Sequence, residues 1–418
     1  MRVMTDNANF QSQALPFWQR TFSSLRYRNY RLLWLGSCAE HMGLYMETMA
    51  MAWLMKELTE SPYYLGLLAV CRIAPLVFFA LLGGMATDRV DRRKLLMICL
   101  LGSAFISIVL LALVRTGVIA PWHLLAAGAL NSVLLGFNHP VRDAIIPNLV
   151  PKGEWMNAIA LDTISVRASA IVIAPITGYL ISWYGTTPLF GARALGMGLA
   201  VLWLLMVKVP STPASAKKQG AWRNLSKGLT YAVTSGLIMS LVLVFALREF
   251  QNEMSSVFLP FFAEDILRSG ATGFGYLNMA QSVGATIGLF GITTLGNFRY
   301  KGRLIIGAGI SMGFLLLVFP LSQWLPLSLL LLFGVNAAGT VFENVSRTAL
   351  QTIVPDEMRG RVMSLREVVR GLFGSWVSYG LGVGGEYLGV VTASLFLGVF
   401  VIVSVSLMAF LLPSFRKL

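Results

Sequence analysis

The sequence predicts an all-α polytopic membrane protein with twelve transmembrane helices, arranged as two parallel six-helix repeats around a central cavity. Apolar residues make up 56% of the chain and charged residues only 12%, against about 25% charged residues in an average soluble domain, and the mean hydropathy is +0.70. Apolar runs of roughly 20 residues, the length that crosses a bilayer, follow one another along the chain. An internal repeat divides these runs into two sets of six.

The expected spans are bounded by glycine, proline and charged residues. They cover residues 31–56, 63–87, 94–115, 121–147, 154–183, 188–208, 233–262, 273–296, 303–321, 325–351, 362–385 and 389–412. The corresponding domains are a cytoplasmic N-terminal segment (1–30), an N-terminal six-helix bundle (31–208), a cytoplasmic linker (209–232), a C-terminal six-helix bundle (233–412) and a cytoplasmic tail (413–418).

The distribution of basic residues predicts the orientation of these spans. With both termini in the cytoplasm, most of the 33 lysines and arginines fall in cytoplasmic segments. The opposite side receives Lys56, Arg115, Arg193 and Arg268. The net charge of +14 therefore reflects membrane topology, and the scatter of basic residues over many short loops excludes a nucleic-acid partner.

The repeat is visible in two pairs of segments. "LTESPYYLGLL" from Leu58 aligns with "LRSGATGFGYL" from Leu267 at an offset of 209 residues, half the chain length of 418. "RDAIIPNLVPKGEWMNAIAL" from Arg142 resembles "RTALQTIVPDEMRGRVMSL" from Arg347. Because both halves begin on the same side, the repeats are parallel, and such repeats place a binding site between the halves near the bilayer midplane.

The run "LVLVFALREFQNEMSSVFLPFF" from Leu241 contains Arg248, Glu249, Asn252 and Glu253. Each formal charge costs about 2.5–3.5 kcal/mol at the centre of a membrane helix. The offset of 209 relates Glu249 to Glu40 in the first span. We interpret these two carboxylates as proton-coupled groups near the midplane.

Other embedded polar residues are candidate contacts for cargo or protons. They are His41, Glu47, Arg72, His139, Arg248, Asn252, Glu253 and Glu343. A packing role remains open for several of them, because Arg248 can neutralise Glu249 or Glu253, Arg72 can balance Glu47, and a lone histidine such as His139 is often a hydrogen-bonded packing residue.

The most specific motif is "GMATDRVDRRK", Gly84 to Lys94, between the second and third spans. It resembles the loop signature G-x-x-x-D-R-x-x-R-[RK] of the major facilitator superfamily in sequence and position, with Asp91 where many members have glycine. The resemblance implies a cytoplasmic gate in which Asp88 docks against the start of span eleven, near Arg366, and Arg92 pairs with an acidic group, here Asp143. Arg89, Arg93, Arg142 and Arg347 are assigned to the same gate. A loop that serves only topology is the alternative.

The fifth span contains Ala174-Pro175-x-x-Gly178, which resembles the Gly-Pro-x-x-Gly kink of the superfamily's antiporters. Proline removes a backbone hydrogen bond and glycine permits close helix contact, so a purely structural bend is the alternative to a role in antiport.

The resemblance covers nearly the whole chain and is strongest to the twelve-span bacterial group of drug and siderophore exporters, including enterobactin exporter-like and macrolide efflux-like proteins. It implies a proton-coupled exporter of an organic solute in the bacterial cytoplasmic membrane, working as a monomer by alternating access. A lipid or lysolipid translocase and an uptake permease for a small metabolite are the alternatives. No enzyme motif, cofactor site or metal site is expected, since HExxH, GxSxG and P-loop patterns are absent from the sequence.

Overall fold

The computed structural model describes residues 22–86, 90–207, 229–231, 235–295 and 300–411. The expected N-terminal segment, linker and tail therefore lie largely outside the described residues, as do Asp88 and Arg89 of the loop motif.

Twelve long α-helices form the described part of the chain, which contains no β-strand. The first half consists of a short helix η1 (Ser23–Arg26), α2 (Arg28–Thr59), α3 (Pro62–Ala86), α4 (Arg92–Arg115), α5 (Pro121–Leu149), η2 (Lys152–Glu154), α6 (Trp155–Tyr184) and α7 (Thr187–Met206). The second half consists of α9 (Gly236–Phe261), the turn η3 (Phe262–Ile266), α10 (Gly270–Leu295), α11 (Lys301–Val318), η4 (Phe319–Leu321), α12 (Leu325–Ile353), α13 (Asp356–Leu388) and α14 (Val390–Leu411).

Eight of these helices are long and apolar enough to cross a membrane by length and composition, within the residues described. The other four are α2, α9, α10 and α13, whose sequences carry charged, polar or small residues. The predicted fold class is confirmed by this all-helical architecture.

Local signals explain where the helices begin and end. Asp91 caps α4, because its carboxylate accepts hydrogen bonds from the backbone N–H groups of Arg93 (2.9 Å) and Lys94 (3.2 Å). Gly389, with φ of +79°, separates α13 from α14 in the hairpin that the sequence marks with a single interruption. The aspartate in place of the usual glycine in the loop motif thus serves as a helix cap.

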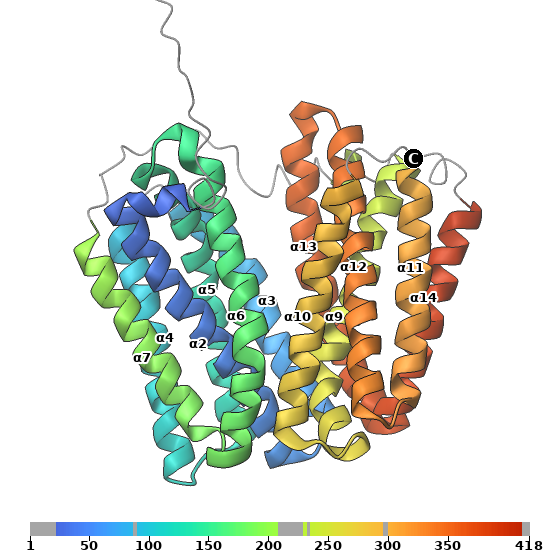
Figure 1. Ribbon diagram of the computed structural model, residues 1–418, viewed down its shortest axis with the longest axis horizontal. Coiled ribbons are helices and arrows are strands. Elements are labelled where there is room, and N and C mark those ends of the chain that lie inside the picture. Colours follow the sequence, from blue (N-terminus) through green and yellow to red (C-terminus); the bar gives the residue numbers. More distant parts are fainter. Residues whose placement is uncertain (1–21, 87–89, 208–228, 232–234, 296–299, 412–418) are drawn as a thin grey trace, which may run out of the picture.

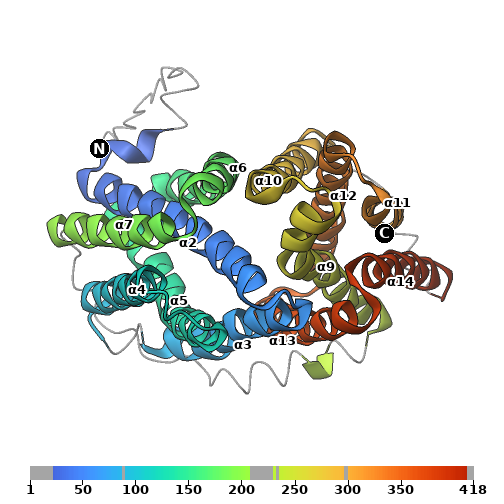
Figure 2. The ribbon, with the colours of Figure 1, turned by 90° about the horizontal axis from the view of Figure 1, so that it is seen from below.

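The helices form two bundles, α2 to α7 and α9 to α14, which lie side by side (Figure 1). Figure 2 shows α3 beside α13 and α6 facing α10 across the boundary between the bundles. We call the end at which α2 begins the basic end, and it includes Arg28, Arg92, Lys152, Lys301 and Arg359. The other end, here called the acidic end, includes Glu57, Glu60, Glu264, Asp265 and Glu386.

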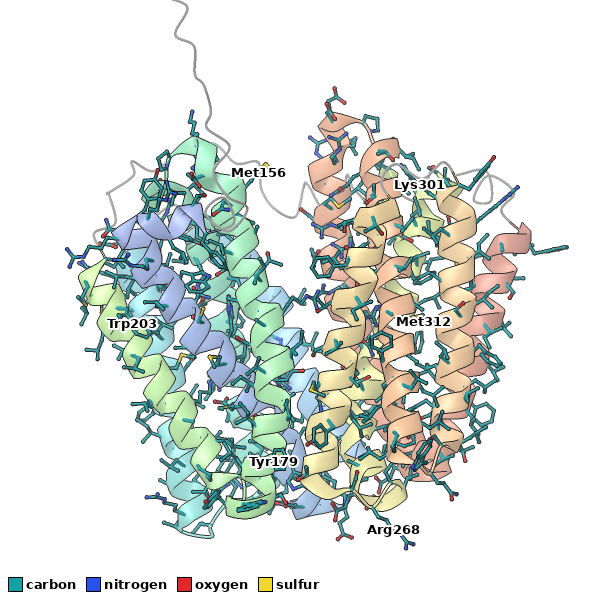
Figure 3. All side chains as sticks on the ribbon, in the orientation of Figure 1. Met156, Tyr179, Trp203, Arg268, Lys301 and Met312 are labelled. Carbon is teal, nitrogen blue, oxygen red and sulfur yellow. The ribbon has the colours of Figure 1, made fainter. Side chains whose placement is uncertain are left out.

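Met156 and Lys301 lie at the basic end, whereas Tyr179 and Arg268 lie at the acidic end (Figure 3). The hydroxyl groups of Tyr179 and Tyr276 are hydrogen bonded to each other across the boundary between the halves. Trp53 and Phe274 also meet there, with ring centroids 5.7 Å apart. The two halves are therefore joined at the acidic end.

Two glycine pairs bring the halves into backbone contact. A Cβ atom added to Gly275 of α10 would lie 2.7 Å from the carbonyl oxygen of Ala174 and 3.0 Å from the Cα of Gly178, both on α6. A Cβ atom on Gly66 of α3 would lie 2.8 Å from the Cα of Gly382 on α13. Gly66 and Gly275 are related by the offset of 209, so the two crossings are repeat-related. Such close approach is what small residues permit between membrane helices.

The contact with Gly275 therefore explains why a residue without a side chain occupies position 178. Pro175 does not end the helix, since α6 continues from Trp155 to Tyr184. One apolar cluster contains residues of both halves, among them Leu65 and Phe258, whereas a second cluster, near Tyr30 and Leu149, contains residues of the first half alone.

Gly275→Ala is expected to separate the halves at the acidic end, because its methyl group would overlap the backbone of α6. The measurement is the distance between spin labels at Leu58 and Arg268, by double electron–electron resonance, in a background in which Cys38, Cys71 and Cys99 are replaced.

The matched control is Gly198→Ala, since a Cβ atom there meets nothing within 4 Å. That change should leave the distances unaltered and stabilise α7 by up to about 0.5–1 kcal/mol. Identical distance distributions for the two variants would contradict the assigned role of the glycine crossing.

Candidate functional site

Glu40 lies inside the first bundle, where Arg142 of α5 forms an ion pair with it. The Asn138 side-chain amide donates a second hydrogen bond to Glu40, 3.0 Å long. A guanidinium group can only donate, so its contact with His41 Nε2, at 3.3 Å, requires that nitrogen to be unprotonated. His41 Nδ1 then carries the proton and donates to Ser165 Oγ at 3.1 Å.

Glu47 forms the second buried pair of the first half, with Arg193 of α7. The Ser107 hydroxyl and the Asn131 amide each donate to its carboxylate at 2.7 Å. Glu47 is thus enclosed by the first bundle, and its contact with cargo or protons stays a prediction. Arg193, which the sequence assigns to the far side of the membrane, has a side chain that is only 1% exposed and that is directed into the bundle.

Arg72 of α3 binds a different residue from the partner considered in the sequence. Its Nη2 donates to Thr48 Oγ1 at 2.6 Å, while the Glu47 carboxylate is held by Arg193. Arg72 is partly exposed and interacts electrostatically with Glu47, as the sequence suggested, and with Glu253 on the other half. It therefore lies near the boundary between the two halves.

A chain of alternating charges begins at Arg248 in the second half. Arg248 Nε lies 3.8 Å from Glu343 Oε2 on α12, and the other oxygen of Glu343 accepts a hydrogen bond of 2.9 Å from Arg366 Nη2 on α13. The Arg366 guanidinium also lies over the ring of Phe245, 4.5 Å from its centroid. Both arginines are buried, so Glu343 is shared between two cations inside the bundle.

The chain continues along α13 and returns to α9. Arg366 Nη1 donates to Glu367 at 2.6 Å, Glu367 lies 4.0 Å from Arg370, and Arg370 Nε lies 3.7 Å from Glu249 Oε1. Because Glu249 follows Arg248 directly, three arginines and three glutamates close a neutral ring on α9, α12 and α13. Arg366 thus belongs to this ring, and so do two residues, Glu367 and Arg370, that line its exposed side.

The repeat-related helices carry their charges in opposite order. In the first half the carboxylate is on α2 and the arginine on α5, whereas the corresponding pair of the second half has Arg248 on α9 and Glu343 on α12. Glu40 and Glu249 occupy equivalent sequence positions, but they have different surroundings. Glu40 has a single buried cation, whereas Glu249 has Arg370, whose side chain is 48% exposed.

Glu253 lies one turn beyond Glu249 and accepts a hydrogen bond of 2.6 Å from Ser378 of α13. Both carboxylates flank Gly374, where a Cβ atom would lie 3.6 Å from Glu249, 3.8 Å from Glu253 and 4.0 Å from Ile73 of α3. The missing side chain of Gly374 leaves the two carboxylates beside the α3–α13 boundary. Asn252, between them in sequence, donates to Glu249 at 3.3 Å.

The loop motif is partly described. Gly84 lies in the last turns of α3. Arg92 donates to the carbonyl oxygen of Ala144 at 3.2 Å, one residue beyond Asp143, and Arg93 donates to the carbonyl oxygens of Leu204 and Leu205 at the end of α7. These arginines therefore bind helix ends in their own half.

His139, Asp143 and Arg347 are exposed in the part of the chain that the structure describes. The described residues contain no group of three or more His, Cys, Asp or Glu side chains that could hold a metal ion. Sequence reasoning assigned Arg370 and Glu367 to the gate at the start of span eleven, and it did not single out Arg167 or Ser378. The signal for Arg167 was available, because it is a formal charge in the middle of an apolar run.

Comparisons with known proteins agree with this architecture. A family model described as transmembrane secretion effector matches residues 19–417. The staphyloferrin A transporter of Staphylococcus aureus is 22% identical over 371 residues, covering 82% of this chain and 84% of that protein. The enterobactin exporter EntS of Shigella boydii serotype 18 is 26% identical over 312 residues, covering 74% of this chain and 73% of that protein.

Solved structures show the same fold at low sequence identity. A POT family transporter in complex with a thioalcohol-conjugated peptide has a TM-score of 0.73 at 14% identity, covering 93% of this chain and 96% of that chain. The nucleoside transporter NupG also gives 0.73 at 14% identity, over 94% and 99% of the two chains. A bacterial homolog of the human lysosomal transporter Spinster, in an inward-facing and unoccupied conformation, gives 0.65 at 16% identity, over 94% and 96%.

Glu343→Gln is expected to destabilise the protein by about 3–5 kcal/mol, because it leaves Arg248 and Arg366 buried without their shared carboxylate. The matched control is Glu367→Gln, whose side chain is 57% exposed and whose loss should cost about 1 kcal/mol or less. The midpoint of thermal unfolding in detergent compares the two. Equal midpoints would mean that Glu343 does not hold the ring together.

Proposed function

The chain belongs to the transmembrane secretion effector family, a group of major facilitator transporters, and from this we propose that it exports an amphipathic organic solute of the siderophore or drug type in exchange for protons. The observation that carries the proposal is the placement of Glu249 and Glu253 near the middle of α9, beside the boundary between the halves. Ionisable residues at such positions are the groups that carriers use to bind and release protons.

The proposed orientation places the basic end and both termini in the bacterial cytoplasm, in accordance with the excess of lysine and arginine in the loops at that end. The contacts that join the halves at the acidic end then close the outer side. The structure corresponds in this proposal to the state that receives cargo from the cytoplasm. One chain supplies both halves and their boundary, which supports a monomer as the transporting unit.

Lys56 and Asp265 form the proposed outer gate. Their side chains are 2.9 Å apart, and they are separated by 209 residues, so they occupy equivalent positions in the two repeats. An ion pair between repeat mates lies on the axis that relates the halves. Opening of the outer side must break this pair, together with the hydrogen bond of 2.6 Å from Ser61 to Glu386.

The proton-coupling role is proposed for Glu249 and Glu253. A proton on either carboxylate removes one negative charge from the boundary, and on Glu249 it removes the charge that attracts Arg370. Glu40 is better suited to holding α2 against α5, because Arg142 and Asn138 both bind it inside the bundle. Of the two repeat-related carboxylates, Glu40 is thus assigned a structural role and Glu249 a role in proton coupling.

The inner gate is proposed to form at the basic end when the outer gate opens. Its components are Gly84, Asp88, Arg89, Arg92 and Asp143 with the neighbouring residues Arg93, Arg142, Arg347 and Arg366. The contacts of Arg92 and Arg93 with helix ends support a rigid first half that moves as one body. Pro175 and Gly178 would contribute through the α6–α10 crossing.

A lipid or lysolipid translocase is the second candidate, and one observation favours it. A pocket of about 460 Å³ lies on α9, α13 and α14, lined by apolar residues such as Phe250, Trp376, Phe396 and Phe400. Trp376 is 74% exposed, as is expected of a surface that faces acyl chains. Cargo with a long hydrocarbon chain could lie in this pocket during entry from the side.

Inverted membrane vesicles test the proposal. Vesicles that contain the protein should accumulate at least one compound from a panel of siderophores and amphipathic drugs when the interior is acidified, and a protonophore should abolish the accumulation. One pH unit supplies about 1.4 kcal/mol per proton, which sustains about tenfold accumulation at one proton per solute. Control vesicles lack the protein.

Two outcomes would contradict export by proton exchange. Accumulation in right-side-out vesicles alone would indicate uptake. Gradient-independent movement of a labelled lysophospholipid, without transport of any compound in the panel, would favour the lipid translocase.

A further inference from the structure

Arg167 is a cation in the middle of α6 that has no partner among the residues that the structure describes. It lies twelve residues from the start of the helix at Trp155, or about 18 Å along a helix of thirty residues. Its side chain is exposed, and it makes no hydrogen bond or ion pair with any residue that the structure describes. An arginine at this depth cannot face lipid without a large cost, so it must face water or another polar group.

The direction of Arg167 follows from its helical position. Ala174 and Gly178 follow it at i+7 and i+11, which places all three on one stripe of α6. Ala174 and Gly178 contact α10 of the other half at the acidic end. Arg167 is about 10 Å nearer the basic end on the same stripe, where α6 and α10 diverge (Figure 1).

The helices around Arg167 agree with this direction. It lies within electrostatic range of Tyr45 on α2 and of Arg248 on α9. The Tyr45 hydroxyl is 3.5 Å from Ser282 on α10, and Met42 and Met46 on α2 are partly exposed. The surroundings therefore combine hydroxyl groups and apolar side chains with an unneutralised positive charge.

The buried arginines of the two bundles contrast with Arg167, which is exposed. Arg142, Arg193, Arg248 and Arg366 each have a glutamate within ion-pair distance. Each of these buried arginines therefore has a glutamate of the protein beside it, whereas no described carboxylate pairs with Arg167. A planar guanidinium binds a carboxylate through two parallel hydrogen bonds, so an acid group of the cargo would complete the missing pair.

We infer that Arg167 is the specificity-determining residue for cargo: it binds a carboxylate group, so the transported compounds are amphipathic acids. The inference rests on the proposed export function and adds the chemical class of the solute. The apolar part of such a compound would lie against Tyr45, Met42 and Met46 while its carboxylate contacts Arg167.

The binding experiment uses 2-naphthoate and 2-naphthamide, which have nearly the same shape and differ in charge. The purified full-length protein at pH 7 and constant ionic strength should bind the acid more tightly than the amide, measured as the ligand-dependent rise in thermal midpoint. Arg167→Gln should weaken binding of the acid by about tenfold or more and leave binding of the amide unchanged.

Two further variants complete the design. Arg303→Gln removes the same charge from an exposed arginine beside Tyr300 at the basic end, and it should keep the full preference for the acid. Arg167→Lys keeps the charge but not the planar fork, so its preference should fall several-fold. Should Arg167→Gln fail to purify, an unchanged preference in Arg167→Lys would overturn the inference.

The inference is overturned if the parent protein does not prefer the acid, or if Arg167→Gln retains that preference. These results are independent of the vesicle experiment. Transport of only neutral compounds would leave export intact and refute the assignment of Arg167. A clear preference for the acid without any transport would leave the carboxylate site intact and refute export.

Discussion

The pairing of charges inside the membrane is the constraint on which the rest of the structure depends. An ionised side chain in this setting needs a partner or water. The first half satisfies the requirement with two enclosed pairs, Glu40–Arg142 and Glu47–Arg193, which join α2 to α5 and α7. The second half uses a ring that closes on itself but leaves Glu367 and Arg370 half exposed. The carboxylates of these first-half pairs are thus enclosed, whereas the second half carries accessible carboxylates at the boundary.

The two repeats share a fold but differ in how their buried charges are paired. The order of acid and base on the paired helices is reversed, and the boundary carboxylates Glu249 and Glu253 belong to the second half alone. The contacts that hold the acidic end together are, by contrast, repeat-related, since Gly66 corresponds to Gly275 and Lys56 to Asp265. Symmetric contacts therefore join the halves, while asymmetric charges distinguish them. A carrier that exchanges two different species can use this combination.

The sequence predicted the twelve helices, the repeat and the family, because span length and hydrophobicity are local properties. It also located the carboxylates of α2 and α9. It could not predict the partners, since whether Glu47 pairs with Arg72 or Arg193 depends on how α2 packs against α3 and α7. Arg193 was assigned to the far side of the membrane, and only packing shows that its side chain is buried against Glu47. Arg167 was visible as a charge in an apolar run, but the direction it faces follows only from the contact of Gly178 with α10.

The central claim is that Glu249 and Glu253 couple proton movement to the transport of cargo. The most direct measurement compares uphill accumulation with counterflow in proteoliposomes for the parent protein, for Glu249→Gln with Glu253→Gln, and for Glu60→Gln, an exposed carboxylate at the acidic end. The account predicts that the double variant exchanges solute in counterflow but loses proton-driven accumulation, and that Glu60→Gln retains accumulation. Accumulation by the double variant at the parent rate would contradict the account.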